Sequence, residues 1–238
     1  MMFRRVLVAL AGMLAAGAPA LWAGDSATFV NLGFSADGSV YMFAQYGVRS
    51  GTLRPWADLF VVDVAGNDFV PGGRASYTHD RPIVAGQSGS GAMHSLIARN
   101  APLAERHGVV FPNQGQPLYI ALAGDPALRN ETIRFRDFAS GAETIYHEAT
   151  LVQTVEGSGA GLRSSFVINM RRWPAGRPGQ ARSFAVGSPG VWRQGILSYR
   201  IRQVLVSPSG DSMVFVVEMR QAAGNTHNVR YMIEAVRF

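Results

Sequence analysis

The sequence predicts a mainly β protein built from antiparallel sheets, with one short helical insertion near residues 91–107. Three observations carry this prediction. Short runs rich in β-branched and aromatic residues recur along the chain, and turn-forming residues separate them. Two of these runs, near opposite ends of the chain, follow similar turns. One stretch in the middle instead spaces its apolar residues as an amphipathic helix does.

Two hairpins, one near each terminus, form an internal repeat with an offset of 172 residues. The first begins with FSADGSVYMF at residues 34–43 and the second with VSPSGDSMVF at residues 206–215. Gly38 and Gly210 hold the same place in the two turns, where glycine tolerates the positive φ that tight turns require. Each turn is followed by a strand, a polar connection and a second strand. The shared order predicts the same hairpin at both ends.

These turn sequences resemble the repeat of TolB-type and WD-type β-propellers, whose blades carry F-S-P-D-G just before an inner strand. The resemblance implies blade-like hairpins near both termini, and it also implies that the two ends of the chain pair with each other. No third copy of the motif occurs between the two hairpins. The sequence therefore leaves two architectures open, a degenerate propeller and a β-sandwich.

The middle of the chain divides into a glycine-rich loop, a helix and further strands. The loop at 86–91 leads into the helix, which Pro102 kinks or restarts and Gly108 ends. A turn at Ser140-Gly141 joins two of the strands, and the Pro- and Gly-containing run 173–182 is predicted to be a loop. The predicted strands are 118–122, 131–138, 143–155, 163–171 and 196–206.

The first 23 residues have the layout of a secretory signal peptide. Arg4 and Arg5 give a positive start, an uncharged run follows, and small residues provide cleavage points after Ala20 or Ala23. The uncharged run is shorter than the roughly 20 apolar residues that a membrane span needs. We therefore expect a cleaved signal peptide at 1–23 and a single β-rich domain at 24–238, either periplasmic or secreted and not integral to a membrane.

The composition excludes several classes of chemistry. The chain has no cysteine, which excludes disulfides, thiol catalysis and iron–sulfur clusters. All 22 basic residues are arginine, and the absence of lysine excludes a standard P-loop. The arginines are scattered rather than clustered, so we expect no nucleic-acid partner. The positive net charge favours an acidic surface, or another protein of the cell envelope, as partner.

Three further segments carry a family resemblance: GDSATFVNLGFSADGSVYMFAQYGV, the strand pair around WADLFVVDV, and the helix ending in APLAERHG. Together they resemble a bacterial family of predicted secreted proteins that is best known from spirochaetes. The resemblance spans most of the chain after the signal peptide. It implies export and a single β-rich domain, and it supplies no catalytic residue because the family is functionally uncharacterised.

No catalytic or cofactor motif in the sequence is complete. Ser88 and Ser90 lack the glycines at both −2 and +2 that a nucleophile elbow needs, so we interpret this loop as leading into a helix N-cap at Ser90. The glycines of 157–161 depart from a dinucleotide fingerprint and indicate a hairpin loop. The prediction is therefore of no catalytic residue and no cofactor.

The histidines show no spacing typical of a metal site. Zinc needs three or four converging ligands, and neighbours such as His147 and Glu148 point to opposite faces of a strand. The prediction is of no metal, although His79 lies in a polar loop that has the composition to host a site. The five histidines are His79, His94, His107, His147 and His227.

The candidate binding residues are tryptophans next to turns and the arginines beside them, because such side chains often contact partners at interfaces. They are Trp56, Arg172, Trp173, Trp192 and Arg193. The expected function is a non-enzymatic binding or assembly module. Two alternatives stay open. One is an exported hydrolase whose Ser, His and Asp are brought together by the fold. The other is a small outer-membrane β-barrel ending at Phe238.

Overall fold

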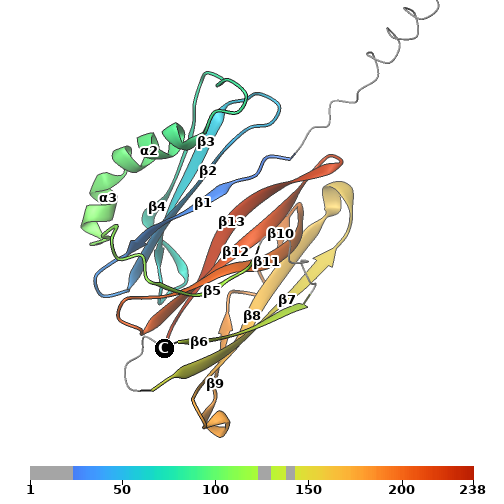
Figure 1. Cartoon of the computed structure of the whole chain (residues 1–238). Helices are drawn as coiled ribbons and strands as arrows, with labels where there is room; N and C mark the ends of the chain where they lie inside the picture. The colour runs from blue at the N-terminus through green and yellow to red at the C-terminus, as the bar shows by residue number, and fades with distance from the viewer. Residues whose placement is uncertain (1–23, 123–129, 138–142) are drawn as a thin grey trace, which may run out of the picture.

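The strands assemble into three antiparallel sheets that stack face to face, and two short helices cover the outside of the first (Figure 1). This computed structural model describes residues 24–122, 130–137 and 143–238. The predicted signal peptide at 1–23 and the predicted turn at Ser140-Gly141 lie outside these ranges. In the described ranges, no helix is long and apolar enough to cross a membrane.

The N-terminal sheet is a meander of four strands in the order β1-β2-β3-β4. Its strands are β1 (Thr28–Phe34), β2 (Val40–Val48), β3 (Pro55–Asp63) and β4 (Asp68–Thr78). The helices α2 (Ser90–Arg99) and α3 (Ala101–Arg106) follow it in the chain. Met93 and Leu96 of α2 pack on Met42 and Leu59 of the sheet.

The central sheet has the order β13-β12-β11-β5, and the outer sheet has the order β10-β8-β7-β6 with β9 paired to β8. The central strands are β5 (Gln116–Ile120), β11 (Ile196–Val206), β12 (Ser212–Ala223) and β13 (Thr226–Arg237). The outer strands are β6 (Asn130–Asp137), β7 (Ile145–Glu156), β8 (Arg163–Pro174), β9 (Arg182–Val186) and β10 (Arg193–Gln194). Two short 3₁₀ turns, η1 (Gly159–Gly161) and η2 (Pro178–Gln180), flank β8.

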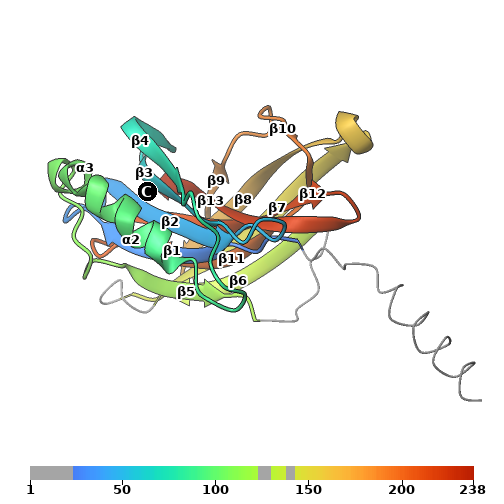
Figure 2. The same cartoon turned by 90° about the horizontal axis from the view of Figure 1, so that it is seen from above.

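The alternation of side chains along β12 shows why the central sheet lies in the middle of the stack. Val214 and Val216 pack in the core shared with the N-terminal sheet. Met213, Phe215 and Val217 pack in the core shared with the outer sheet. A strand buried on both faces needs a nearly continuous apolar run, and the segment SMVFVV supplies it. Figure 2 shows the same layers from above.

Both predicted hairpins are present, as β2–β3 and β12–β13. The turns before them have the same hydrogen bonds: Ser35 N–H donates to the Val40 carbonyl, and Ser207 N–H donates to the Ser212 carbonyl, each at 2.9 Å. The φ angles of Gly38 (68°) and Gly210 (75°) are both positive, as the turn chemistry predicts. The internal repeat is therefore a structural repeat.

The two ends of the described chain also pair, by a short parallel bridge between Ser26 and Val229. Ala27 N–H donates to the Val229 carbonyl at 3.0 Å, and Val229 N–H donates to the Asp25 carbonyl at 2.9 Å. The segment before β1 thus adds a few residues to the outer edge of β13. This edge borders the site described below.

The prediction of a mainly β fold with one helical insertion is confirmed, and the flat stack of sheets corresponds to the sandwich alternative. Two details differ. The helix α2 is capped at Gly89 rather than Ser90, which is the first helical residue. The predicted loop 173–182 is confirmed over 175–181, which include the turn η2, but its two ends belong to strands: β8 ends at Pro174 and β9 begins at Arg182. Strand β9 then pairs with β8.

Candidate ligand-binding cleft

A cleft of about 560 Å³ opens between the N-terminal and central sheets, along β13. We call it the edge cleft. Its lining comes from β2 and β3 (Phe43, Gln45, Asp58, Phe60, Val62), from the β3–β4 turn and β4 (Asn67, Asp68, Phe69, Arg74), from the loop before β10 and β10 itself (Ser188, Val191, Arg193), and from β12 and β13 (Met219, Arg230, Tyr231, Met232, Ile233, Glu234).

A ladder of phenylalanine rings crosses the N-terminal sheet and ends in this cleft. Phe43 and Phe60 lie opposite each other on β2 and β3, with ring centroids 4.7 Å apart. Phe69 on β4 continues the ladder at 5.7 Å from Phe60, and the Arg74 guanidinium lies 5.0 Å from its ring centroid. Phe43 is 1% exposed and Phe69 is 40% exposed. The ladder therefore leads from the core to solvent and presents an aromatic surface there.

The outer edge of β13 forms a polar wall of the cleft. Alternate residues of an edge strand direct both peptide groups away from the neighbouring strand. Two outward N–H groups are capped by side chains of the N-terminal sheet. Tyr231 N–H donates to Gln45 Oε1 at 2.8 Å, and Ala235 N–H donates to Asn67 Oδ1 at 2.7 Å. Ile233 lies between them and by the same alternation directs its peptide groups outward, beside the cleft that it lines.

Glu234 places a carboxylate at one end of the cleft. Its side chain is only 6% exposed, lies 3.5 Å from the Arg193 guanidinium and accepts a hydrogen bond from the Asn67 side chain. Burial raises the pKa of Glu234, while Asn67 and Arg193 oppose that rise by stabilising the charged form. Asn67 therefore holds two parts of β13 at once, the carboxylate of Glu234 and the N–H of Ala235.

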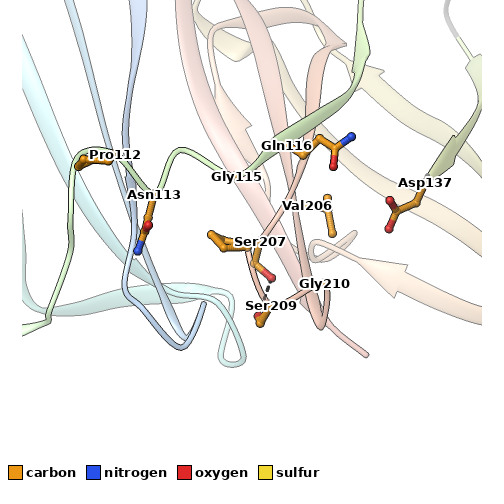
Figure 3. Close-up of a pocket in the computed structure, with 10 residues that line it drawn as sticks. Pro112, Asn113, Gly115, Gln116, Asp137, Val206, Ser207, Ser209 and Gly210 are labelled. Carbon is orange, nitrogen blue, oxygen red and sulfur yellow. Dashed lines mark hydrogen bonds between the residues drawn. The ribbon is translucent and has the colours of Figure 1, made fainter. Parts of the chain in front are cut away.

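A second hollow, of about 550 Å³, lies beside the turn that precedes β12 (Figure 3). Gln116 from β5, Asp137 from β6 and the serines of the turn line it. The Ser207 and Ser209 hydroxyls lie 3.0 Å apart, and both are within hydrogen-bonding distance of the Asp211 carboxylate. These hydroxyls stabilise the turn itself. The edge cleft, with its aromatic surface, is thus the stronger candidate for ligand binding.

A model of the family described as predicted secreted protein, DUF2259, matches residues 42–237. The chain belongs to the DUF2259 family. The match runs from β2 through β13 and includes every residue that lines the edge cleft. No curated protein and no solved structure matches the chain.

The structure of this DUF2259 protein does not gather the predicted binding residues into one surface. Trp56 is 2% exposed, and its indole N–H donates to Asp25 at 3.3 Å. Arg193 pairs with Ser164 near the start of β8, and Arg172 lies eight residues further along that strand, about 26 Å away. Of the predicted set, Arg193 alone lines the edge cleft.

The remaining members of that set make local contacts in the DUF2259 protein. The Arg172 guanidinium lies 3.8 Å from the ring centroid of Phe238, and Trp173 stacks with Tyr146 at 6.2 Å. Trp192 is 37% exposed, with the Arg163 guanidinium 4.7 Å from its ring centroid. The sequence interpretation that tryptophans near turns contact a partner stays a prediction for Trp173 and Trp192, while Trp56 is a core residue.

The histidines and loop serines are dispersed. His79 bonds main-chain atoms of Arg81, and the Ser88 hydroxyl accepts the N–H of Ser90. His147 is 2% exposed, and neither ring nitrogen has a hydrogen-bond partner. Burial, and secondarily the charge of Arg172, lowers the pKa of His147 to about 4, so the ring is neutral at pH 7. Within the described residues, no three His, Asp or Glu side chains are placed to hold a metal ion.

Sequence reasoning missed most residues of the cleft because they come from distant segments. Asn67 and Glu234, for example, are 167 residues apart. One local signal was available: Gln45 and Glu234 are single polar residues inside otherwise apolar runs, YMFAQYGV and YMIEAV. A buried polar residue in a strand needs a partner, and here each of the two has its partner on the facing sheet.

Proposed function

We propose that this exported protein is a non-enzymatic binding module whose ligand occupies the edge cleft. The observation that carries the proposal is the combination of the exposed end of the phenylalanine ladder with the polar edge of β13 in one cleft. Its volume of about 560 Å³ lies within the range of small-molecule sites. Apolar surfaces that lie next to a few fixed polar groups give such sites both affinity and orientation.

Asp58 and Asp68 also line the cleft, but its Arg74 end favours an amphipathic organic anion. Its apolar part would pack on Phe60 and Phe69, and its acidic group would lie near Arg74, whose guanidinium is at the exposed end of the ladder. The other cleft arginines have carboxylate partners: Arg230 pairs with Asp25, and Arg193 with Glu234. An amide or hydroxyl on the ligand would find the outward peptide groups of Ile233.

The non-enzymatic part of the proposal has support from the histidines. A Ser-His-Asp hydrolase needs a histidine hydrogen-bonded to the nucleophile and to a carboxylate. In the described part of the chain, no histidine side chain bonds a serine hydroxyl or a carboxylate. An esterase activity that the Ser88→Ala, Ser90→Ala or His79→Ala variant abolishes would contradict this part.

The binding part is tested with 8-anilinonaphthalene-1-sulfonate, an aromatic anion that fluoresces in apolar sites. We expect Phe69→Ala to weaken its binding about fivefold, because one aromatic contact is lost. Phe111 is the matched control, since it is 62% exposed and outside the cleft, so Phe111→Ala leaves the affinity unchanged. Equal affinities for the wild type and Phe69→Ala would place the probe elsewhere and contradict the proposal.

An uncharged analogue of the probe, N-phenyl-1-naphthylamine, tests the preference for an anion. We expect Arg74→Gln to weaken binding of the sulfonate and to leave binding of the uncharged compound unchanged. A parallel loss for both compounds would mean that Arg74 acts through packing on Phe69 and not through its charge.

The proposal of export by a cleaved signal peptide has one structural support. Gly24 N–H donates to the Thr226 hydroxyl, and the segment Gly24–Ala27 pairs with the edge of β13. Cleavage after Ala23 keeps this whole bridge in the mature protein. N-terminal sequencing of the periplasmic and extracellular fractions is expected to give Gly24, or Leu21 after the alternative cleavage. Recovery with Met1 intact would contradict cleavage.

A further inference from the structure

Among the residues that the structure describes, the outer sheet has one face in the core and one face that nothing covers. Ile133, Leu151 and Ile168 point into the core shared with the central sheet. The alternate residues point the other way, where no helix or sheet of the described chain lies on them (Figure 1). A sheet face exposed to solvent usually carries few large apolar side chains. A cluster of aromatic and charged residues on it therefore points to a function.

Two neighbouring rows of side chains cross this face. In the first row, Arg136 on β6 lies opposite Tyr146 on β7, which lies opposite Trp173 on β8. In the second row, Arg134 lies opposite Glu148, which lies opposite Arg171. We call these six residues the basic face. It carries three guanidinium groups and one carboxylate, which gives it a net charge of +2.

One carboxylate is shared by two of these arginines. Glu148 lies 2.7 Å from Arg134 and 3.9 Å from Arg171. The side chains of Arg134 and Arg171 are nevertheless 78% and 53% exposed. Their positive charge is therefore directed to solvent, where it can meet a negatively charged surface.

The aromatic pair lies beside these charges. Tyr146 and Trp173 stack with ring centroids 6.2 Å apart and planes 17° from parallel, and the Arg171 guanidinium lies 5.8 Å from the Trp173 ring. Trp and Tyr are the residues enriched at the headgroup level of membranes, because each has an apolar ring and a polar group. Arginine and aromatic residues thus form one continuous patch.

We propose that the basic face docks the protein on a membrane surface of anionic phospholipids. The three arginines of the basic face lie on the same open face of the sheet, which suits an extended layer of phosphodiester groups. The net charge of the whole protein also favours its approach to an anionic membrane surface. The net charge of +6 falls only to +4 when the two arginines of residues 1–23 are removed. The basic face is on the outer sheet, so this inference is independent of the edge cleft.

Sedimentation with vesicles tests the proposal on the protein from Gly24 to Phe238. We expect binding to vesicles of equal parts phosphatidylglycerol and phosphatidylcholine, no binding to phosphatidylcholine alone, and weaker binding as salt is raised. The double variant Arg134→Gln/Arg171→Gln is expected to bind at least about tenfold more weakly. Trp173→Ala, which leaves the charge unchanged, is expected to weaken binding about threefold.

The matched control is the double variant Arg220→Gln/Arg237→Gln. It removes the same number of charges from side chains that are 39% and 45% exposed and lie on the central sheet. We expect it to bind within twofold of the wild type, with circular dichroism confirming that all variants are folded. An equal loss in the control would show an effect of net charge alone and overturn the proposal. Absence of wild-type binding to the anionic vesicles would overturn it too, as would tighter binding to polyglutamate, which would indicate an acidic protein partner.

Discussion

The hydroxyl of Ser212 donates a 3.1 Å hydrogen bond to the carbonyl oxygen of Gly38, and this bond joins the two copies of the internal repeat. Gly38 belongs to the turn before β2, and Ser212, the first residue of β12, directly follows the equivalent turn and is fully buried. The turns of the N-terminal and central sheets therefore pack against each other at one end of the stack. The two copies of the repeat are thus similar in sequence and also in direct contact with each other.

This packing predicts that the two equivalent glycines differ in their tolerance of a side chain. A Cβ on Gly38 would lie 2.9 Å from the Ser209 hydroxyl and 3.0 Å from Ser207 Cβ, whereas a Cβ on Gly210 would meet nothing within 4 Å. Both glycines have positive φ, so alanine at either costs about 1–2 kcal/mol of backbone strain. We expect Gly38→Ala to reduce the free energy of unfolding by about 1–3 kcal/mol more than Gly210→Ala does.

Urea unfolding of the two variants measures this difference, and each serves as the control for the other. Because both substitutions add the same methyl group at the same turn position, the strain term largely cancels between them. Equal unfolding midpoints would mean that the contact between the two turns accommodates the methyl group at position 38 without loss of stability.

Most of the strands that the sequence predicts have one or two buried apolar faces. β2 and β12 read as strands because their residues alternate between two cores. β4, with the sequence DFVPGGRASYT, does not, because Pro71 and two glycines make it resemble a loop. As an edge strand it tolerates a proline, and its register against β3 shifts between Phe60 and Val62. The residue pattern of this segment alone is therefore not enough to predict a strand.

The candidate site was less accessible to sequence analysis than the fold. Its position beside a tryptophan makes Arg193 a candidate binding residue, and it does line the edge cleft. Its partner Glu234, and Asn67 that holds the carboxylate, could not be connected with it because the pairing depends on how two sheets face each other. Sequence periodicity indicates which face of a strand is buried, but it does not indicate which strand of another sheet lies opposite.

Asp25 is predicted to contribute strongly to stability, because its ion pair is buried. It lies 2.9 Å from Arg230, with side chains 5% and 13% exposed, and it also accepts the Trp56 indole N–H. Asp25→Ala leaves Arg230 buried without its partner carboxylate, so we expect a loss of about 3 kcal/mol. Thermal and urea unfolding measure this loss.

The control for Asp25 is Glu156, which pairs with Arg163 at a nearly equal distance of 2.8 Å, but with side chains 46% and 50% exposed. Solvent screens this pair, so Glu156→Ala is expected to cost less than about 1 kcal/mol. Similar losses for the two variants would show that burial is not what makes the Asp25 pair strong.

His147 is predicted to make the protein less stable in mild acid. It stacks on Phe135 with ring centroids 5.1 Å apart, and burial lowers its pKa from 6.5 to about 4. Above pH 6.5 the ring is neutral in both the folded and the unfolded chain. As the pH falls from 6.5 to 4, the unfolded chain takes up the proton first, so the free energy of unfolding decreases. The full decrease is about 3 kcal/mol, and below pH 4 this group adds no further loss.

Unfolding free energies measured between pH 7 and pH 5 test this dependence. In that interval we expect the wild type to lose about 2 kcal/mol through His147, while His147→Leu, which has no group to titrate there, loses correspondingly less. His94 is the control because it is exposed on α2, and His94→Gln is expected to follow the wild type. The wild type and His147→Leu could show the same dependence of unfolding free energy on pH. The folded chain would then protonate the His147 ring over the same pH range as the unfolded chain, despite its burial and the charge of Arg172 beside it.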